Sequence, residues 1–299
     1  MPFPPLSGVS SPGQMLYRLA CRFAWLLRRA AEITYEENCL SIAKGAAYSG
    51  LVALFPVLGA TAAVLVEVRA TPVLAVLSHY LSEVLPPGTQ SMVLDRFAEE
   101  GSRPTLLLIA AVALSVHAAS GFMMSLIEGF NAVYHVPAGR PFLRQRGVAA
   151  LLVLVAALPT VGASILLLFG DQILAHVHRW VQTVPPGMPI DEGVNLAWEA
   201  GRVAIAVASV VLVTGLLYFI GPNRPQRWHD VWPGAWVGTA LWLSATAAFA
   251  WYVGNIAQYS VMYGTVGAVI ALLGWIYLIS VAAFVGCAFN AAIEQSRLK

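Results

Sequence analysis

Two long apolar stretches near the end of the chain limit its fold more than any other feature of the sequence. Residues 234–253 and 266–289 contain no charged side chain, and each is long enough to cross the roughly 30 Å hydrocarbon core of a bilayer as a helix. Lipid offers no water to backbone N–H and C=O groups, so both stretches must be helical. The connector between them, residues 254–265, is too short for a domain. The sequence therefore predicts an antiparallel membrane hairpin.

Four further apolar stretches precede this hairpin, which argues against a buried hairpin of a soluble protein. Of the 299 residues, 59% are hydrophobic and 11% are charged, whereas a soluble domain carries about 25% charged residues. We predict an all-α integral membrane protein with six transmembrane helices in one membrane domain, residues 46–290. The expected spans lie near residues 46–66, 105–127, 148–170, 203–220, 234–253 and 266–289.

The N-terminal region has a different pattern. Residues 1–13 are rich in Pro, Ser and Gly, and we expect a disordered tail there. In residues 14–45 apolar residues recur at helical spacing with arginines between them, which predicts an N-terminal amphipathic interfacial helix with its arginines near lipid phosphates. A solvated helix that packs on other protein is the alternative. The apolar residues are Leu16, Leu19, Phe23, Leu26 and Leu27, and the arginines are Arg18, Arg22, Arg28 and Arg29.

The distribution of Lys and Arg predicts the orientation in the membrane. The N-terminal segment, the connectors after the second and fourth spans, and the tail 291–299 together hold 12 of these residues, against five in the other connectors. Segments rich in Lys and Arg stay on the cytoplasmic side. We therefore expect both termini to be cytoplasmic.

Small residues at regular spacing predict close contacts between helices. Gly121, Ser125 and Gly129 recur at every fourth position of the second span, and Gly234 and Gly238 do so in the fifth. Gly264 and Gly267 form a further pair around the start of the sixth span. Tight packing is the favoured interpretation, and a face that slides during transport is the alternative.

Polar side chains inside or beside the spans are candidates for function because lipid disfavours them. His117 is the titratable residue well within a span. We favour a neutral histidine bonded to a neighbouring helix over a proton or ligand site. Glu128 and Asn131, three residues apart, share a helix face, and Lys44 is expected at the same depth. A Lys44–Glu128 ion pair is one hypothesis, and interfacial snorkelling of both side chains is the other.

The sequence offers no template for an enzyme. Cys21, Cys39 and Cys287 have no metal-ligand spacing, and no HExxH, GxSxG or Walker motif occurs. The net charge of +2 is small for a protein that binds nucleic acid. We therefore expect no catalytic residue, metal, cofactor or nucleic-acid partner.

Three blocks of the sequence share their residues, in order, with one known family. They are Ala46-Ala47-Tyr48 with Leu54-Phe55-Pro56; Ser120-Gly121 with Asn131, Tyr134, Val136, Arg140 and Phe142; and Pro222-Asn223, Trp228, Pro233-Gly234-Ala235, Trp242, Phe249, Tyr252, Tyr263-Gly264, Gly267-Ala268, Trp275, Tyr277, Gly286 and Asn290. On these residues the chain resembles the YihY/BrkB family, bacterial inner-membrane proteins once labelled ribonuclease BN. The resemblance implies a six-span protein of the bacterial inner membrane with a role in the cell envelope or in export.

The chain departs from the family pattern at one position. The family often shows Gly-Ala-Glu-x-Asn near the end of the sixth helix, and here that run is Gly286-Cys287-Ala288-Phe289-Asn290. Any mechanism that needs the carboxylate is therefore in doubt for this chain. The ribonuclease label finds no support either, because the sequence shows no basic groove, metal cluster or soluble domain for RNA.

The first functional hypothesis is a transporter or exporter of a lipid-like or small amphiphilic molecule. The alternative is a non-transporting membrane scaffold in an envelope-assembly complex. The expected partners are membrane lipids and an amphiphilic substrate, and a homo-oligomer stays open. The candidate residues of a substrate path are Lys44, Tyr48, Pro56, His117, Glu128, Asn131, Tyr134, Arg140 and Asn290.

Overall fold

The computed structural model describes residues 12–67, 105–137, 139–159, 162, 190–255 and 264–297. Within these ranges the chain is helical and contains no strand. The helices are α1 (Pro12–Glu36), α2 (Cys39–Glu67), α5 (Thr105–Val133), an unlabelled helix over 142–159, α7 (Ile190–Ile220), the 3-10 turn η1 (Trp228–Asp230), α8 (Trp232–Asn255) and α10 (Gly264–Arg297).

Six of the described helices are long and apolar enough to cross a membrane, which confirms the predicted fold class. Their ends differ from the prediction. The third span begins at Phe142 rather than near 148, and most of its predicted second half, 160–170, lies outside the described residues. The sixth helix continues past residue 289 to Arg297. Helical hydrogen bonding continues beyond the lipid core, whereas hydropathy detects the apolar part of a helix alone.

The N-terminal amphipathic helix is shorter than the predicted range 14–45. It ends at Glu36, and the segment from Cys39 onward belongs to α2. Asn38 separates the two helices with φ 54°, a left-handed conformation that Asn adopts more readily than most residues.

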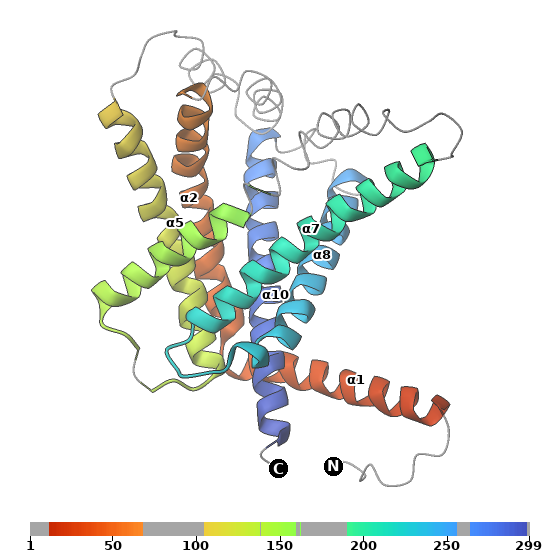
Figure 1. Cartoon of the computed structure of the whole chain (residues 1–299). Coiled ribbons are helices and arrows are strands. Elements are labelled where there is room, and N and C mark those ends of the chain that lie inside the picture. Colours follow the sequence, from red (N-terminus) through yellow and green to blue (C-terminus); the bar gives the residue numbers. More distant parts are fainter. Residues whose placement is uncertain are drawn as a thin grey trace.

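The helices are arranged as a bundle with one helix across its end (Figure 1). α2 packs chiefly on α5, and α10 packs on α8, α1 and α2. The helix over 142–159 and α7 cross the bundle obliquely, while α1 lies across the end where α10 terminates (Figure 1). We call this the basic end; it is formed by α1, residues 134–137 and 139–141, residues 221–231 and the last turns of α10.

An aromatic cluster fills the bundle near the basic end. Phe130 lies edge-on to Tyr218 and to Phe284, with ring centroids 5.3 Å and 5.8 Å apart, and all three side chains are fully buried. Gly129 makes this possible because a Cβ there would overlap the ring of Phe284. Gly121 differs from the expectation: a Cβ there would meet no atom within 4 Å, because no described helix approaches that side of α5 so closely.

The closest helix crossing joins α8 to α10. A Cβ at Gly286 would stand 2.7 Å from the Cα of Gly238 and 2.8 Å from the carbonyl oxygen of Gly234. The Tyr218 hydroxyl of α7 donates a hydrogen bond to the Ala283 carbonyl of α10 at 2.7 Å. Three helices therefore meet at one tightly packed point.

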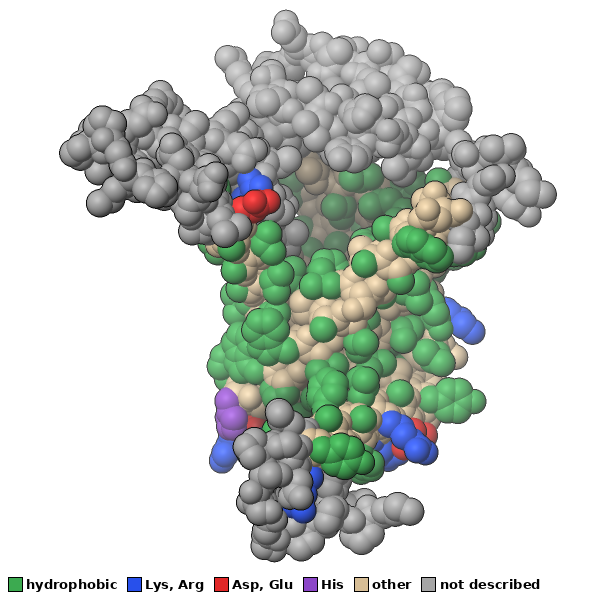
Figure 2. All heavy atoms as spheres, turned by 90° about the vertical axis from the view of Figure 1, so that its right-hand side faces the viewer, with side chains coloured by type: hydrophobic (Ala, Val, Ile, Leu, Met, Phe, Trp, Pro, Cys, Tyr) green, Lys and Arg blue, Asp and Glu red, His purple; other side chains and the backbone are tan. Residues whose placement is uncertain are grey.

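The outside of the bundle suits a lipid environment. Figure 2 shows one side of the molecule, where hydrophobic side chains cover most of the described surface and charged ones gather mainly toward the basic end. Large hydrophobic side chains are exposed on several spans, among them Leu106, Ile109, Leu114, Leu154 and Ile205.

Candidate functional site

The connector between α7 and α8, residues 221–231, is held at the basic end by side chains from other elements. Arg140 donates hydrogen bonds to the carbonyl oxygens of Ile220, Gly221 and Pro222, at 3.0, 2.9 and 3.4 Å. The last carbonyls of a helix have no partner within it and carry partial negative charge. Arg140 therefore caps the C-terminus of α7. Gln226 also donates to carbonyls of the last turn of α7.

Two asparagines predicted as path residues also bind the backbone of this connector. Asn131 Oδ1 accepts a hydrogen bond from the Asn223 N–H at 2.8 Å. Asn290 Oδ1 accepts from the Gly234 N–H at 2.6 Å, and its Nδ2 donates to the Val231 carbonyl at 3.0 Å. Asn290 is buried and so caps the start of α8 from the side of α10.

Replacing Asn290 with alanine is expected to destabilise the protein by about 2–4 kcal/mol, because the buried Gly234 N–H loses its partner and the Val231 carbonyl loses one of its two donors, keeping the Ala235 N–H. The thermal unfolding midpoint in detergent should fall by roughly 5–10 °C. Asn255→Ala is the matched control, since Asn255 is exposed and donates to the Trp251 carbonyl of its own helix. Equal midpoints for both variants would contradict the capping role.

A cavity of about 480 Å³ opens beside the connector at the basic end. We call it the basic-end cavity. It is lined by side chains from the turn after α5, the connector, the start of α8 and the last turns of α10. These residues are Tyr134, Arg224, Pro225, Gln226, Arg227, Asp230, Pro233, Asn290, Ile293, Glu294 and Arg297.

One ion pair stands between this cavity and a second hollow. Arg224 Nη2 lies 2.8 and 2.9 Å from the two carboxylate oxygens of Glu294, and the Arg224 guanidinium lies 4.3 Å from the centre of the Tyr134 ring. The second hollow, about 370 Å³, shares Tyr134, Arg224, Pro225 and Glu294 with the first. The Arg224–Glu294 pair is therefore a common wall of both hollows.

The charges of the basic-end cavity do not cancel. Arg297 forms an ion pair with Asp230 at 2.9 Å, and Arg224 forms one with Glu294. Arg227 takes part in no ion pair among the described residues. Three arginines thus face two carboxylates, which leaves one positive charge. Burial lowers the pKa of Arg224, but the neighbouring Glu294 carboxylate outweighs it and raises this pKa. Burial also raises the pKa of the Tyr134 hydroxyl, which therefore stays neutral.

A mainly apolar groove lies between α7 and α8. Its volume is about 640 Å³, and its lining residues are Glu199, Ala200, Val203, Ala204, Val207 and Ala208 of α7 with Trp236 of α8. Trp236 and Pro233, which lines the basic-end cavity, are three residues apart and so neighbour each other on the helix surface. The first turns of α8 therefore contribute to both the charged cavity and the groove.

The remaining predicted path residues lie elsewhere. Lys44 and Tyr48 are exposed on α2, and Glu128 is exposed on α5. No ion pair joins Lys44 to Glu128 in the part of the chain that the structure describes. Pro56 interrupts α2, and its carbonyl oxygen lies 2.6 Å from the Ser115 hydroxyl of α5.

His117 contacts the neighbouring helix over 142–159. Arg146 Nη2 lies 3.0 Å from His117 Nε2 and donates to the His117 carbonyl at 2.9 Å. A guanidinium donates and does not accept, so Nε2 is the acceptor in this contact. This arrangement is that of a histidine bonded to a neighbouring helix.

Sequence reasoning did not single out the charged residues of the cavity. Arg224, Arg227 and Arg297 contributed to the positive-inside count alone, and Glu294 and Asp230 were not candidates. One signal was available for Glu294. It follows Asn290 by four residues and therefore lies on the same side of α10.

Comparison with known proteins relates the chain to one family. A family model described as Virulence factor BrkB matches residues 31–299. YfkH of Bacillus subtilis, described as a ribonuclease-like protein, is 25% identical over 255 residues, which are 84% of this chain and 88% of YfkH. No solved structure matches.

Two longer relatives carry the description UPF0761 membrane protein. The one from Bordetella petrii is 29% identical over 291 residues, 93% of this chain and 59% of the relative. The one from Chromobacterium violaceum is 30% identical over 210 residues, 68% of this chain and 45% of the relative. The chain thus spans about half the length of these two relatives.

Proposed function

The chain belongs to the Virulence factor BrkB family of multi-pass membrane proteins, and we propose that it transports an anionic amphiphile of the bacterial cell envelope. The headgroup binds in the basic-end cavity, and the apolar part lies along the groove between α7 and α8. By the positive-inside rule the basic end lies on the cytoplasmic side, so in this proposal the headgroup enters the cavity from the cytoplasm.

The contribution of the first turns of α8 to both hollows is the observation that carries this proposal. A lipid-like molecule has a charged head next to an apolar tail, and α8 contributes Pro233 to the charged cavity and Trp236 to the apolar groove. The groove opens outward, with Val203 54% and Trp236 55% exposed. A tail can therefore enter it sideways from the bilayer.

The charges select an anion. Arg227 offers a guanidinium that no carboxylate occupies among the described residues. Arginine binds phosphate and carboxylate groups through paired N–H donors. A headgroup that reaches Arg224 competes with Glu294 for the same donors, and loss of this ion pair joins the two hollows that it separates.

Native mass spectrometry of the protein extracted gently with its own lipids tests the proposal. We expect a specific anionic lipid or metabolite to co-purify, and Arg227→Gln to lower its retention about tenfold through loss of a charge-assisted hydrogen bond. Arg144→Gln is the matched control, because Arg144 is an exposed arginine at the same end that does not line the cavity.

The opposite result favours the second candidate function, a scaffold. Bulk lipid retained equally by the wild type, Arg227→Gln and Arg144→Gln would exclude headgroup binding in the cavity. The exposed groove with Trp236 would then be the binding site for a helix of an envelope-assembly partner. No group of three potential metal ligands occurs among the described residues, and we propose no catalytic step.

A further inference from the structure

The two halves of α1 have different surroundings although they share one apolar side. Met15, Leu19, Leu26, Ala30 and Ile33 are spaced by four, seven, four and three residues, which places them on the same side of the helix. Leu26, Ala30 and Ile33 are buried, whereas Met15 and Leu19 are 57% and 52% exposed. The apolar side is therefore covered in the C-terminal half of α1 and uncovered in the N-terminal half.

α10 provides most of the cover. α1 packs mainly on α10, and the Phe23 and Phe289 rings, 5.6 Å apart, are among the contacts between them. Toward its N-terminus α1 extends beyond the bundle, across the direction of α10 (Figure 1). A helix in this position runs along the membrane surface where the spans end.

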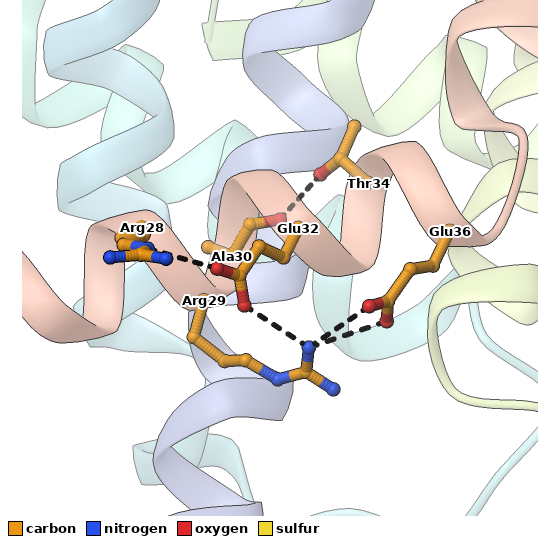
Figure 3. A network of polar contacts seen from close by, with 6 residues as sticks. All are labelled: Arg28, Arg29, Ala30, Glu32, Thr34 and Glu36. Carbon is orange, nitrogen blue, oxygen red and sulfur yellow. Dashed lines mark hydrogen bonds and ion pairs between the residues drawn. The ribbon is translucent and has the colours of Figure 1, made fainter. Parts of the chain in front are cut away.

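The charges of the two halves also differ. In the C-terminal half Arg28 pairs with Glu32 at 3.0 Å, and Arg29 pairs with Glu32 and Glu36 at 3.3 Å (Figure 3). These two arginines are neutralised within the helix. Residues 12–27 contain Arg18 and Arg22 and no acidic residue.

We infer that the N-terminal half of α1 is a membrane anchor that binds anionic phospholipid headgroups beside the bundle. The uncovered side with Met15 and Leu19 enters the boundary between headgroups and acyl chains, and Arg18 and Arg22 bind lipid phosphates. Neither arginine has an acidic partner among the described residues.

A bilayer fits this surface better than a soluble partner does. The exposed apolar side continues the interface with α10, which is itself a membrane-spanning helix. An anionic surface attracts each nearby arginine with about 1 kcal/mol, or about fivefold in affinity. The anchor acts independently of the cavity and the groove, so it stands whether or not the protein transports.

Spin labels on the full-length protein in lipid bilayers test the anchor. Cys21 is an exposed native cysteine two residues from Leu19, hence on the opposite side of the helix, while Cys39 and Cys287 are fully buried and protected from the label. A label at Leu19→Cys in a Cys21→Ser background should be reached by oxygen more than by a water-soluble nickel complex. A label at Cys21 should show the reverse.

The lipid dependence of this result identifies the ligand. In bilayers of phosphatidylcholine with phosphatidylglycerol, Arg18→Gln with Arg22→Gln should lower the ratio of immersed to water-exposed label at residue 19 by roughly 25-fold. Arg28→Gln should leave it unchanged, because Arg28 is paired in the covered half. Equal water exposure at positions 19 and 21, or no effect of the double substitution, would overturn the anchor. Protection of position 19 from both reagents would instead indicate a protein partner and would also overturn it.

Discussion

Replacing Gly286 with alanine is expected to destabilise the membrane bundle by about 3 kcal/mol or more, which lowers the thermal unfolding midpoint by roughly 6 °C or more. The new Cβ would overlap the Tyr218 hydroxyl, and it would stand 2.7 Å from the Gly238 Cα and 2.8 Å from the Gly234 carbonyl oxygen. The last two neighbours are backbone atoms, so a rotation of the Tyr218 side chain would not relieve the whole overlap. α8 and α10 must move apart, and the hydrogen bond from Tyr218 to Ala283 is strained with them.

Gly59→Ala is the matched control for this substitution. Gly59 lies in the α2 span, and a Cβ there meets no atom within 4 Å. Alanine favours a helix over glycine by about 0.5–1 kcal/mol, so the control should unfold at the wild-type temperature or slightly above. A Gly286→Ala variant that unfolds together with the Gly59→Ala variant would show that α8 and α10 do not cross this closely. The measurement is thermal unfolding of purified protein in detergent.

The membrane fold was predictable because its main determinant, the length of uncharged apolar stretches, is a local property of the sequence. Long uncharged stretches such as 266–289 have few alternatives to a spanning helix. Helix ends were less predictable. At the basic end, α2 and α10 extend beyond their apolar stretches, and a hydropathy profile marks only those stretches. The glycines of the fifth span illustrate a further limit. The spacing of Gly234 and Gly238 indicates a contact face, but the sequence does not show that its partner is Gly286 of the sixth span.

The polar candidates show what sequence reasoning cannot supply. Asn131, Arg140 and Asn290 were selected because polar groups are costly near lipid, and the structure gives each of them a backbone partner. Which backbone groups lack a hydrogen-bond partner depends on where the helices meet. The sequence of one segment does not contain this information. Ala288, which replaces the carboxylate common in the family, is fully buried. The carboxylate that faces the cavity is Glu294 on the last turns of α10.

Glu294→Gln is expected to tighten the binding of an anionic headgroup about tenfold. In the wild type, Glu294 occupies the Arg224 donors at 2.8 and 2.9 Å, and a ligand must displace it. The neutral amide keeps the shape of the side chain but gives up the charge-assisted contact, so Arg224 becomes available and the net positive charge of the cavity rises by one. Titration of the detergent-solubilised protein with a short-chain phosphatidic acid, followed by calorimetry, measures the change.

Two further variants make this prediction decisive. Glu128→Gln removes an exposed carboxylate of α5 that does not line the cavity, and it should leave the affinity unchanged, which separates local competition from a change in overall charge. Arg224→Gln should weaken binding below the wild-type level, because the competed cation itself is lost. If Glu294→Gln binds phosphatidic acid no more tightly than the wild type while Arg224→Gln binds it more weakly, Arg224 contacts the headgroup without displacement of Glu294. If all variants bind equally, the headgroup does not enter this cavity, and the role of the ion pair is to fasten α10 to the connector.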